Sequence, residues 1–238
     1  MSRAPALTER ALQELRAAST AAIDPTARAD YVHLLEAIPD AVLRDGPAMA
    51  AEGGGLHVTA SAVVLDGAAE QLALVWHGKA HCWVQPGGHL EAEDASLEEA
   101  ARREVAEETG LQDLSLVGPG PALLEVHDLA STFGTCGGHW DVVFVLRAEG
   151  DAADVTLHPE SPDGPAPIWV PWPRTETPGS LDDSGLPATG FSPQVPLPEN
   201  AASDMAEILA RLAPYLDEFA APTRTAKHRG LSEADGNG

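Results

Sequence analysis

Few cysteines, few basic residues and no long apolar run set the first limits on this chain of 238 residues. Its two cysteines, Cys82 and Cys136, could form a single disulfide, but in a chain of this size we expect both to be reduced. No apolar run approaches the roughly 18 residues that a membrane-spanning helix needs. The N-terminus also lacks the apolar segment of a secretion signal. The sequence therefore predicts a cytoplasmic protein that does not enter a membrane.

Basic residues are scarce, with 14 Lys and Arg against 37 Asp and Glu, so the formal net charge is −23. The phosphates of a nucleic acid and the headgroups of an anionic membrane would be repelled by this charge. We therefore expect neither of them as a partner. A small phosphorylated substrate remains compatible, because a bound metal ion reverses the local field.

Several common site motifs are absent. The chain has no Walker-type Gly-x-x-x-x-Gly-Lys-Ser/Thr loop, no Gly-x-Ser-x-Gly elbow, no dinucleotide-binding fingerprint and no internal repeat. The nine histidines and two cysteines show no zinc-binding spacing. What the chain does have is 44% hydrophobic residues, enough for one substantial core with appendages.

The best-signalled element is a helix that follows a glycine turn at Gly87–Gly88. Ser96 is a good N-cap, and Glu99 three residues later would complete a capping box by reaching back to the Ser96 N–H. Gly110 stands where a left-handed residue would end the helix. The end signals therefore predict a helix between Ser96 and Gly110.

Three carboxylates, Glu104, Glu107 and Glu108, lie at helical spacing on neighbouring positions of this helix. A solvent-exposed acidic face is the simpler interpretation. A metal site is favoured because Glu104 and Glu108 share the side of the apolar row, and because Arg103 can hold a carboxylate through paired hydrogen bonds. Mg²⁺ and Ca²⁺ take such oxygen ligands. From spacing and composition alone, both interpretations stay open.

The run from Gly88 to Leu111 resembles the Nudix box, which reads Gly, five residues, Glu, seven residues, Arg-Glu-apolar-x-Glu-Glu-x-Gly-apolar. Residues Arg103 to Leu111 match the second half one by one. Asp94 stands where the family usually has Glu, and eight residues rather than seven separate it from Arg103. The additional residue falls before Ser96, so the frame of the helix is kept. No role is predicted for Asp94.

The resemblance implies a hydrolase that cleaves the pyrophosphate linkage of a nucleoside diphosphate joined to another moiety. We expect Mg²⁺ or Mn²⁺ rather than zinc, because carboxylates and phosphates are hard oxygen donors. The expected metal ligands are Glu104, Glu107, Glu108 and Glu91. Arg103 would hold Glu104, and either Glu104 or Glu160 would accept the proton of the attacking water.

Four further residues, Gly87, Gly88, His89 and His139, are candidates for contact with the substrate. Glycine N–H groups can approach an anion closely, and the histidines could contact a phosphate or a base. Each histidine has a plainer interpretation as a structural hydrogen-bonding group, and Glu160 as a surface glutamate. Both interpretations stay open for these residues.

The order of helical and strand patterns predicts an α+β fold, an α/β/α sandwich with a mixed sheet, in agreement with the Nudix resemblance. Residues 1–50 would form an N-terminal helical hairpin, whose expected role is to cover the core or a partner subunit, or to close over the site. Residues 55–219 would form the Nudix domain, with a Pro/Gly-rich loop at 173–198 and a last helix capped by Asn200. Residues 220–238 are expected to be disordered.

Other functions remain open within this scheme. The substrate could be a damaged nucleoside triphosphate, because the box would contact only the pyrophosphate. A non-catalytic nucleotide sensor is a second alternative, although it has no need for three adjacent carboxylates. The amphipathic terminal helices also leave a homodimer open.

Overall fold

The computed structural model describes residues 4–18, 23–43, 55–128, 136–161, 164–181 and 187–220. Its helices are α1 (Ala4–Ala17), α2 (Pro25–Ala37), α3 (Leu97–Thr109) and α4 (Met205–Phe219), with a short 3₁₀ turn, η1 (Pro39–Val42). Its strands are β1 (Gly55–Leu65), β2 (Gln71–His77), β3 (Cys82–Val84), β4 (Gly87–His89), β5 (Leu114–Leu116), β6 (Leu123–Asp128), β7 (Cys136–Ala148), β8 (Ile168–Pro171), β9 (Arg174–Leu181) and β10 (Pro187–Phe191).

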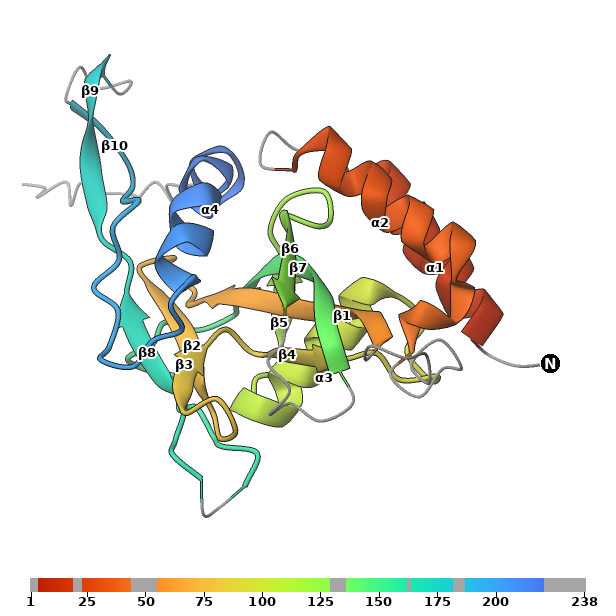
Figure 1. Ribbon diagram of the computed structural model, residues 1–238. Helices are drawn as coiled ribbons and strands as arrows, with labels where there is room; N and C mark the ends of the chain where they lie inside the picture. Colours follow the sequence, from red (N-terminus) through yellow and green to blue (C-terminus); the bar gives the residue numbers. More distant parts are fainter. Residues whose placement is uncertain are drawn as a thin grey trace, which may run out of the picture.

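Strands β1 and β7 form the parallel centre of an eight-stranded mixed sheet (Figure 1). The other pairings are antiparallel: β1 with β2 and β4, β2 with β3 and β8, and β7 with β5 and β6. Strands β1 and β2 form a hairpin. Its turn begins at Asp66, whose side chain accepts hydrogen bonds from the N–H groups of Glu70 and Gln71.

Alternating residues of β1 pack into two separate cores, as expected for a strand with both faces covered. Val58, Ala60 and Ala62 belong to a core shared with α1, α2 and α3. Val63 and Leu65 belong to a second core shared with α4. The sheet therefore lies between two helical layers, and the predicted α+β class is confirmed.

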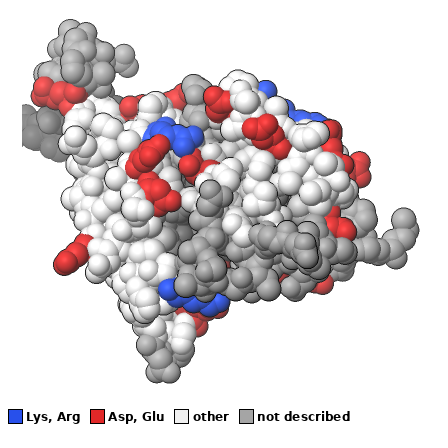
Figure 2. Space-filling model, viewed as in Figure 1, with Lys and Arg blue, Asp and Glu red and all other residues white. Residues whose placement is uncertain are grey.

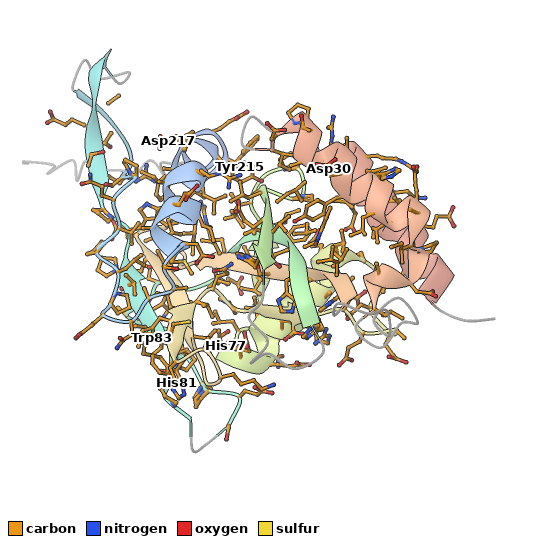
Figure 3. All side chains as sticks on the ribbon, viewed as in Figure 1. Asp30, His77, His81, Trp83, Tyr215 and Asp217 are labelled. Atoms are coloured by element: carbon orange, nitrogen blue, oxygen red, sulfur yellow. The ribbon has the colours of Figure 1, made fainter. Side chains whose placement is uncertain are left out.

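Two side chains near the C-terminal end of helix α4 form hydrogen bonds with neighbouring segments (Figure 3). The hydroxyl of Tyr215 donates to the carbonyl of Val117 at 2.7 Å, and Asp217 accepts from the N–H of Phe191 at 2.6 Å. The predicted helix was too long at its start, because α4 begins at Met205 and Asn200 does not cap it. Residues 200–204 are consequently free to form part of a cavity wall.

The N-terminal hairpin of α1 and α2 packs against the domain through buried apolar residues and a few polar anchors. Tyr31 donates to the carbonyls of Glu125 and Asp141 at 2.5 and 3.0 Å. Glu14 accepts from the N–H of Leu97 at 2.8 Å. The hairpin therefore supplies an anion to the N-terminus of α3, where the helix dipole favours negative charge.

The expectation of a Pro/Gly-rich loop at 173–198 is wrong for half of the segment. Strands β9 and β10 pair there as a separate antiparallel ribbon (Figure 1). Arg174 lies over the ring of its register partner Phe191, 3.9 Å from the centroid. A two-stranded ribbon has an unpaired edge on each strand, so proline, which lacks an N–H, is tolerated there. The predicted disordered tail beyond residue 220 and residues 129–135 lie outside the described residues.

The described surface is acidic in character, as the composition predicts. On the face drawn in Figure 2, acidic side chains are spread over several elements and the basic ones stand among them. No helix in the described part of the chain is both long and apolar enough to cross a membrane.

Candidate active site

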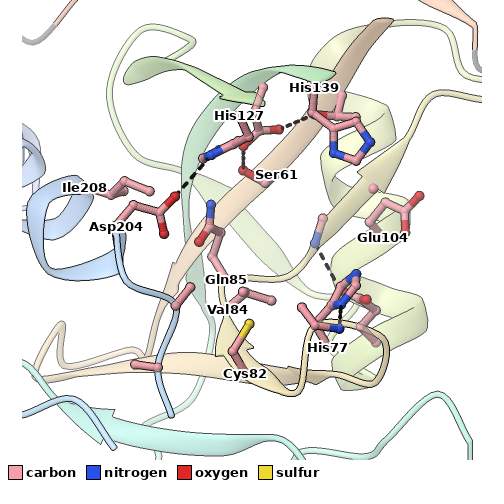
Figure 4. Close-up of a pocket in the computed structure, with 18 of the residues that line it drawn as sticks. Ser61, His77, Cys82, Val84, Gln85, Glu104, His127, His139, Asp204 and Ile208 are labelled. Carbon is pink, nitrogen blue, oxygen red and sulfur yellow. Dashed lines mark hydrogen bonds and ion pairs between the residues drawn. The ribbon is translucent and has the colours of Figure 1, made fainter. Parts of the chain in front are cut away.

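A cavity of about 830 Å³ opens over β1, between α3 and the start of α4. In Figure 4, Glu104 and His139 lie on one side of this cavity, and His127 and Asp204 lie on the other. Its remaining wall comes from the β2–β3 hairpin, the Gly87–His89 strand and residues 201–204. The residues that line the cavity thus lie as far apart in the sequence as Thr59 and Ile208.

Helix α3 has the predicted ends. The Ser96 hydroxyl accepts from the N–H of Glu99 at 3.0 Å, and Gly110 is left-handed with φ of 77°. One detail differs, because the Glu99 carboxylate accepts from the N–H of Ala95, not from that of Ser96. These signals fix the frame of the helix, so Glu104 and Glu108 face the cavity while Val105 is buried in the core.

Gly87 and Gly88 touch the helix carboxylates directly. The N–H of Gly87 donates to Glu108 Oε2 at 3.0 Å. A Cβ atom on Gly88 would lie 2.7 Å from the carboxyl carbon of Glu104, and one on Gly87 would lie 2.3 Å from the Ser61 Cβ. The pair of glycines is therefore required for the strand to approach both carboxylates.

Arg103 links the loop before α3 to the helix through paired hydrogen bonds. Its guanidinium contacts both Asp94 oxygens, at 3.0 and 3.1 Å, and donates to the carbonyl of His89 at 2.8 Å. It also donates to Glu104 at 2.9 Å and to Glu107 at 3.2 Å. Arg103 therefore holds Glu104, as predicted.

Asp94 was missed as a site residue, yet its side chain is only 4% exposed and is the bidentate partner of Arg103. It also accepts from the N–H of Glu91 at 2.8 Å, which closes the loop before the helix. The added residue is absorbed between Asp94 and Ser96, so the carboxylate keeps its place. The acidic position in the Nudix pattern was the signal that could have identified it.

Replacing Asp94 with alanine should lower kcat by about tenfold, because residues that orient metal ligands typically contribute 10- to 100-fold. Arg103 would lose its bidentate partner and Glu104 its fixed orientation. The measurement is steady-state kinetics on Asp94→Ala beside Asp113→Ala, which removes an exposed acid outside the cavity. Equal kcat values for the two variants would contradict the positioning role.

The four proposed metal ligands divide between two adjoining hollows. Glu104 and Glu108 line the main cavity, whereas Glu91 and Glu107 line a second hollow of about 590 Å³ that also includes Glu104. Glu104 is thus the carboxylate that both hollows share. Glu160 is exposed and lines neither hollow, although its charge acts on Glu108.

Burial and like charges make the helix carboxylates hard to ionise. Burial raises the pKa of Glu108 to about 7, against the opposing hydrogen bond from Gly87, and the charges of Glu104, Glu160 and Glu107 add to the rise. Burial also raises the pKa of Glu104, although Arg103 opposes it. A cation at this place would therefore relieve an unfavourable concentration of negative charge.

His89 and His139 both line the cavity, and a third histidine, His57, lies between them. The centroid of the His57 ring lies 4.8 Å from the centroid of the His89 ring and 4.7 Å from that of the His139 ring. Burial, with the neighbouring histidines, lowers the pKa of His139 to about 3, so its ring is neutral near pH 7. His57 was missed because its neighbours come from strands more than 30 and 80 positions away.

The far side of the cavity is polar and was not predicted. Asp141 is buried and accepts from Thr59 at 2.8 Å and from Ser61 at 2.5 Å. His127 pairs with Asp204 at 3.1 Å, between β6 and the start of α4. Cys82, a free thiol as expected, also lines the cavity. The contribution of residues 200–202 to this wall could not be predicted, because it depends on their pairing with Trp83, which is distant in the sequence.

The His127–Asp204 pair should make stability depend on pH. The hydrogen bond to Asp204 raises the pKa of His127, and the same bond lowers the pKa of Asp204. The histidine's contribution is complete below its unfolded pKa of about 6.5 and is lost as pH rises through the higher folded value. The aspartate's contribution is complete above about 3.9 and is lost as pH falls through the lower folded value.

His127→Gln should therefore lower the free energy of unfolding by about 0.5 kcal/mol more at about pH 5.5 than at about pH 8.5. The effect is modest because the Asp204 side chain is 47% exposed and water screens the pair. Urea unfolding at both pH values would measure it, with His33→Gln on the exposed side of α2 as control. The same loss at both pH values would exclude a charged pair.

Comparison with known proteins identifies the family of this chain. A family model described as NUDIX domain matches residues 55–184. An RNA pyrophosphohydrolase from Rhizobium meliloti (strain 1021) is 31% identical over 115 residues, which cover 44% of this chain and 67% of that protein.

Two solved structures are similar to part of this chain. A NUDIX-family hydrolase from Clostridium perfringens is 18% identical with a TM-score of 0.46, and the match covers 67% of this chain and 97% of that one. An Ap4A hydrolase complex from C. elegans is 15% identical with a TM-score of 0.45, over 68% of this chain and 98% of that one. Both TM-scores lie below 0.5, so the assignment rests on the family model and the sequence relative.

The family model covers more than half of the chain and includes the whole glycine turn, helix α3 and the strands that frame the cavity. The sequence relative matches at 31% identity over two thirds of its own length. The chain belongs to the NUDIX family and is a Nudix hydrolase, an enzyme that acts on pyrophosphate bonds.

Proposed function

We propose that this enzyme uses Mg²⁺ or Mn²⁺ to cleave the pyrophosphate linkage of a nucleoside diphosphate joined to another moiety. The observation that carries the proposal is the placement of Glu104 and Glu108 against the Gly87–Gly88 strand at the wall of a large cavity. A pyrophosphate is highly charged, and it needs both a cation and a close backbone approach.

The donor set fits a hard divalent cation. Glu104 and Glu108 line one hollow and Glu91 and Glu107 the other, and hard oxygen ligands suit Mg²⁺ and Mn²⁺. Among the described residues, the group of three or more side chains already close enough to share an ion is His57, His89 and His139, so the carboxylates would have to converge when they bind the ion. Burial raises the pKa of both Glu104 and Glu108, and a bound cation would favour their charged forms. When bound, the ion neutralises phosphate oxygens and lowers the pKa of an attacking water.

The chain's own residues supply position and proton transfer. Arg103 fixes Glu104 through the bonds described above, and Glu104 is our first candidate for the base that accepts the proton of the attacking water. Glu160 remains the second candidate, because its charge already acts on Glu108. Gly87, Gly88, His89 and His139 would contact the phosphates from the strand side.

The remaining cavity would hold the nucleoside or the second moiety. Its volume of about 830 Å³ is in the upper part of the range for small-molecule sites and exceeds what a pyrophosphate needs. Its far wall offers Asp141, Asp204 and His127 as polar partners and Val126 and Ile208 as apolar surface. This mixture suits a nucleoside.

Three alternatives differ from this proposal, two in the substrate and one in the absence of turnover. A house-cleaning nucleoside triphosphate pyrophosphohydrolase would use the same carboxylates, and a sensor would bind the nucleotide without turnover. The relative from Rhizobium meliloti is named for action on RNA. The net charge of −23 disfavours a long nucleic acid here, although it leaves the terminal phosphates of an RNA open. Cytoplasmic location and a homodimer also stay proposals.

A substrate panel tests the proposal. Purified protein with Mg²⁺ would be incubated with nucleoside diphosphate sugars, dinucleoside polyphosphates, nucleoside triphosphates and a 5′-triphosphorylated RNA oligomer, and products would be separated by chromatography. We expect the highest kcat/KM for a nucleoside diphosphate derivative, with a nucleoside monophosphate as product. Preference for triphosphates or for the RNA would overturn the proposed substrate class, and binding without turnover would support the sensor.

A further inference from the structure

A row of histidines crosses the sheet at one end of the cavity. His57 on β1 is the direct register partner of His139 on the parallel strand β7. On the other side of β1, His89 on β4 is the partner of Thr59, two positions from His57 and hence on the same face of the strand. Three adjacent strands, β4, β1 and β7, therefore bring one imidazole each to the same place.

The three rings are close enough to share one ion. One ligand nitrogen from each residue can be chosen so that all three lie within 4.8 Å of one another. A zinc ion with bonds of about 2.0–2.1 Å needs nitrogens about 3.4 Å apart in tetrahedral geometry. Each ring would thus have to move by about 1 Å or less. The ring of His89, which is stacked on His57 and borders the cavity, would turn about its Cβ–Cγ bond to aim its nitrogen.

The surroundings suit a metal-binding histidine. His57 is fully buried, and its Nδ1 lies 3.4 Å from the carbonyl of Gly55, a contact that leaves Nε2 as the ligand nitrogen. The Nε2 of His139 is buried and has no hydrogen-bond partner among the described residues. The neutral form of an imidazole is the one that binds metal ions.

We propose that His57, His89 and His139 form a binding site for one Zn²⁺ ion, separate from the carboxylate site that prefers Mg²⁺ or Mn²⁺. Imidazole is a softer ligand than carboxylate, so the two sites select different ions. Three protein ligands leave a fourth position open, and two of the three, His89 and His139, line the cavity. The proposal does not depend on the proposed substrate.

A Zn²⁺ ion at this site would bind ring nitrogens of His89 and His139, two residues that line the cavity. The carbonyl of His89 also accepts from Arg103, so the ion would sit one residue from the machinery that orients Glu104. Zinc and a substrate phosphate would then compete for the same side chains.

Metal titration of the full-length protein tests the site. Protein stripped with a chelator and then saturated with Mg²⁺ would be titrated with Co²⁺, whose visible absorption reports four-coordinate geometry, and then with Zn²⁺ in competition with a chromophoric chelator. We expect one equivalent of Zn²⁺ to bind in the presence of excess Mg²⁺. His57→Phe, which keeps a ring in the stack, should weaken Zn²⁺ binding by about a hundredfold or more.

A second variant and two controls keep the test decisive. His139→Gln, which removes a partly exposed ligand, should weaken Zn²⁺ binding as strongly even if His57→Phe fails to fold. His33→Phe on the exposed side of α2 and Glu108→Gln should both bind Zn²⁺ as the wild type does. Unchanged affinity in folded His57→Phe or His139→Gln, or loss of Zn²⁺ in Glu108→Gln alone, would overturn the proposal.

Discussion

Glu108→Gln is expected to lower kcat by about a thousandfold while KM changes little. The substitution removes one of the two α3 carboxylates at the cavity wall, and the loss corresponds to about 4 kcal/mol of transition-state stabilisation. Charge stabilisation of this kind acts on the transition state more than on the bound substrate. The measurement is steady-state kinetics at saturating Mg²⁺ with a substrate identified by the panel.

This variant should still fold. Burial raises the pKa of Glu108 to about 7, so the neutral form is already well tolerated at this position. Glutamine keeps nearly the same shape and an oxygen that accepts the Gly87 N–H bond. Glu98→Gln is a matched control, because Glu98 lies on the same helix, pairs with Arg102 and lines neither hollow. A wild-type kcat in Glu108→Gln would show that Glu108 is not a ligand.

Gly88→Ala should lower kcat by about a hundredfold, the second largest effect that we expect. The new Cβ would lie 2.7 Å from the carboxyl carbon of Glu104, so either the carboxylate or the strand must shift. A displacement of about 1 Å in a catalytic group can cost about a hundredfold in rate. Because Arg103 and Asp94 restrain Glu104, the strain cannot be relieved by a simple turn of its side chain.

Gly78→Ala is the matched control, since a Cβ at that position has no neighbour within 4 Å. Gly78 lies in the β2–β3 turn, close to the cavity but not in its wall. We expect its kcat to be that of the wild type. Retained activity in Gly88→Ala, with the protein folded, would mean that the glycine is not required for the approach to Glu104.

Local signals explain what could be predicted. Ser96 and Gly110 define the ends of α3 within one stretch of sequence, so the positions of Glu104 and Glu108 followed from helical spacing. The β-rich composition of residues 57–65 favoured a strand, and both faces of that strand pack into apolar cores.

Long-range pairing explains what was missed. The approach of His57 to His139 depends on the parallel register of β1 and β7, which no periodicity in either strand encodes. The far wall likewise depends on residues 200–202 pairing with Trp83. Asp94 was missed because of the length of the loop before α3. The added residue departs from the Nudix pattern, yet the loop accommodates it and Asp94 keeps its bidentate contact with Arg103.

The central claim is that a divalent cation on the α3 carboxylates is needed to cleave a pyrophosphate in the adjoining cavity. Product formation from a nucleoside diphosphate derivative, followed while Mg²⁺ is added back to chelator-treated wild-type enzyme, tests it most directly. We expect no nucleoside monophosphate without the ion and a saturable rise in rate as Mg²⁺ is added. Turnover that persists in excess chelator would contradict the claim.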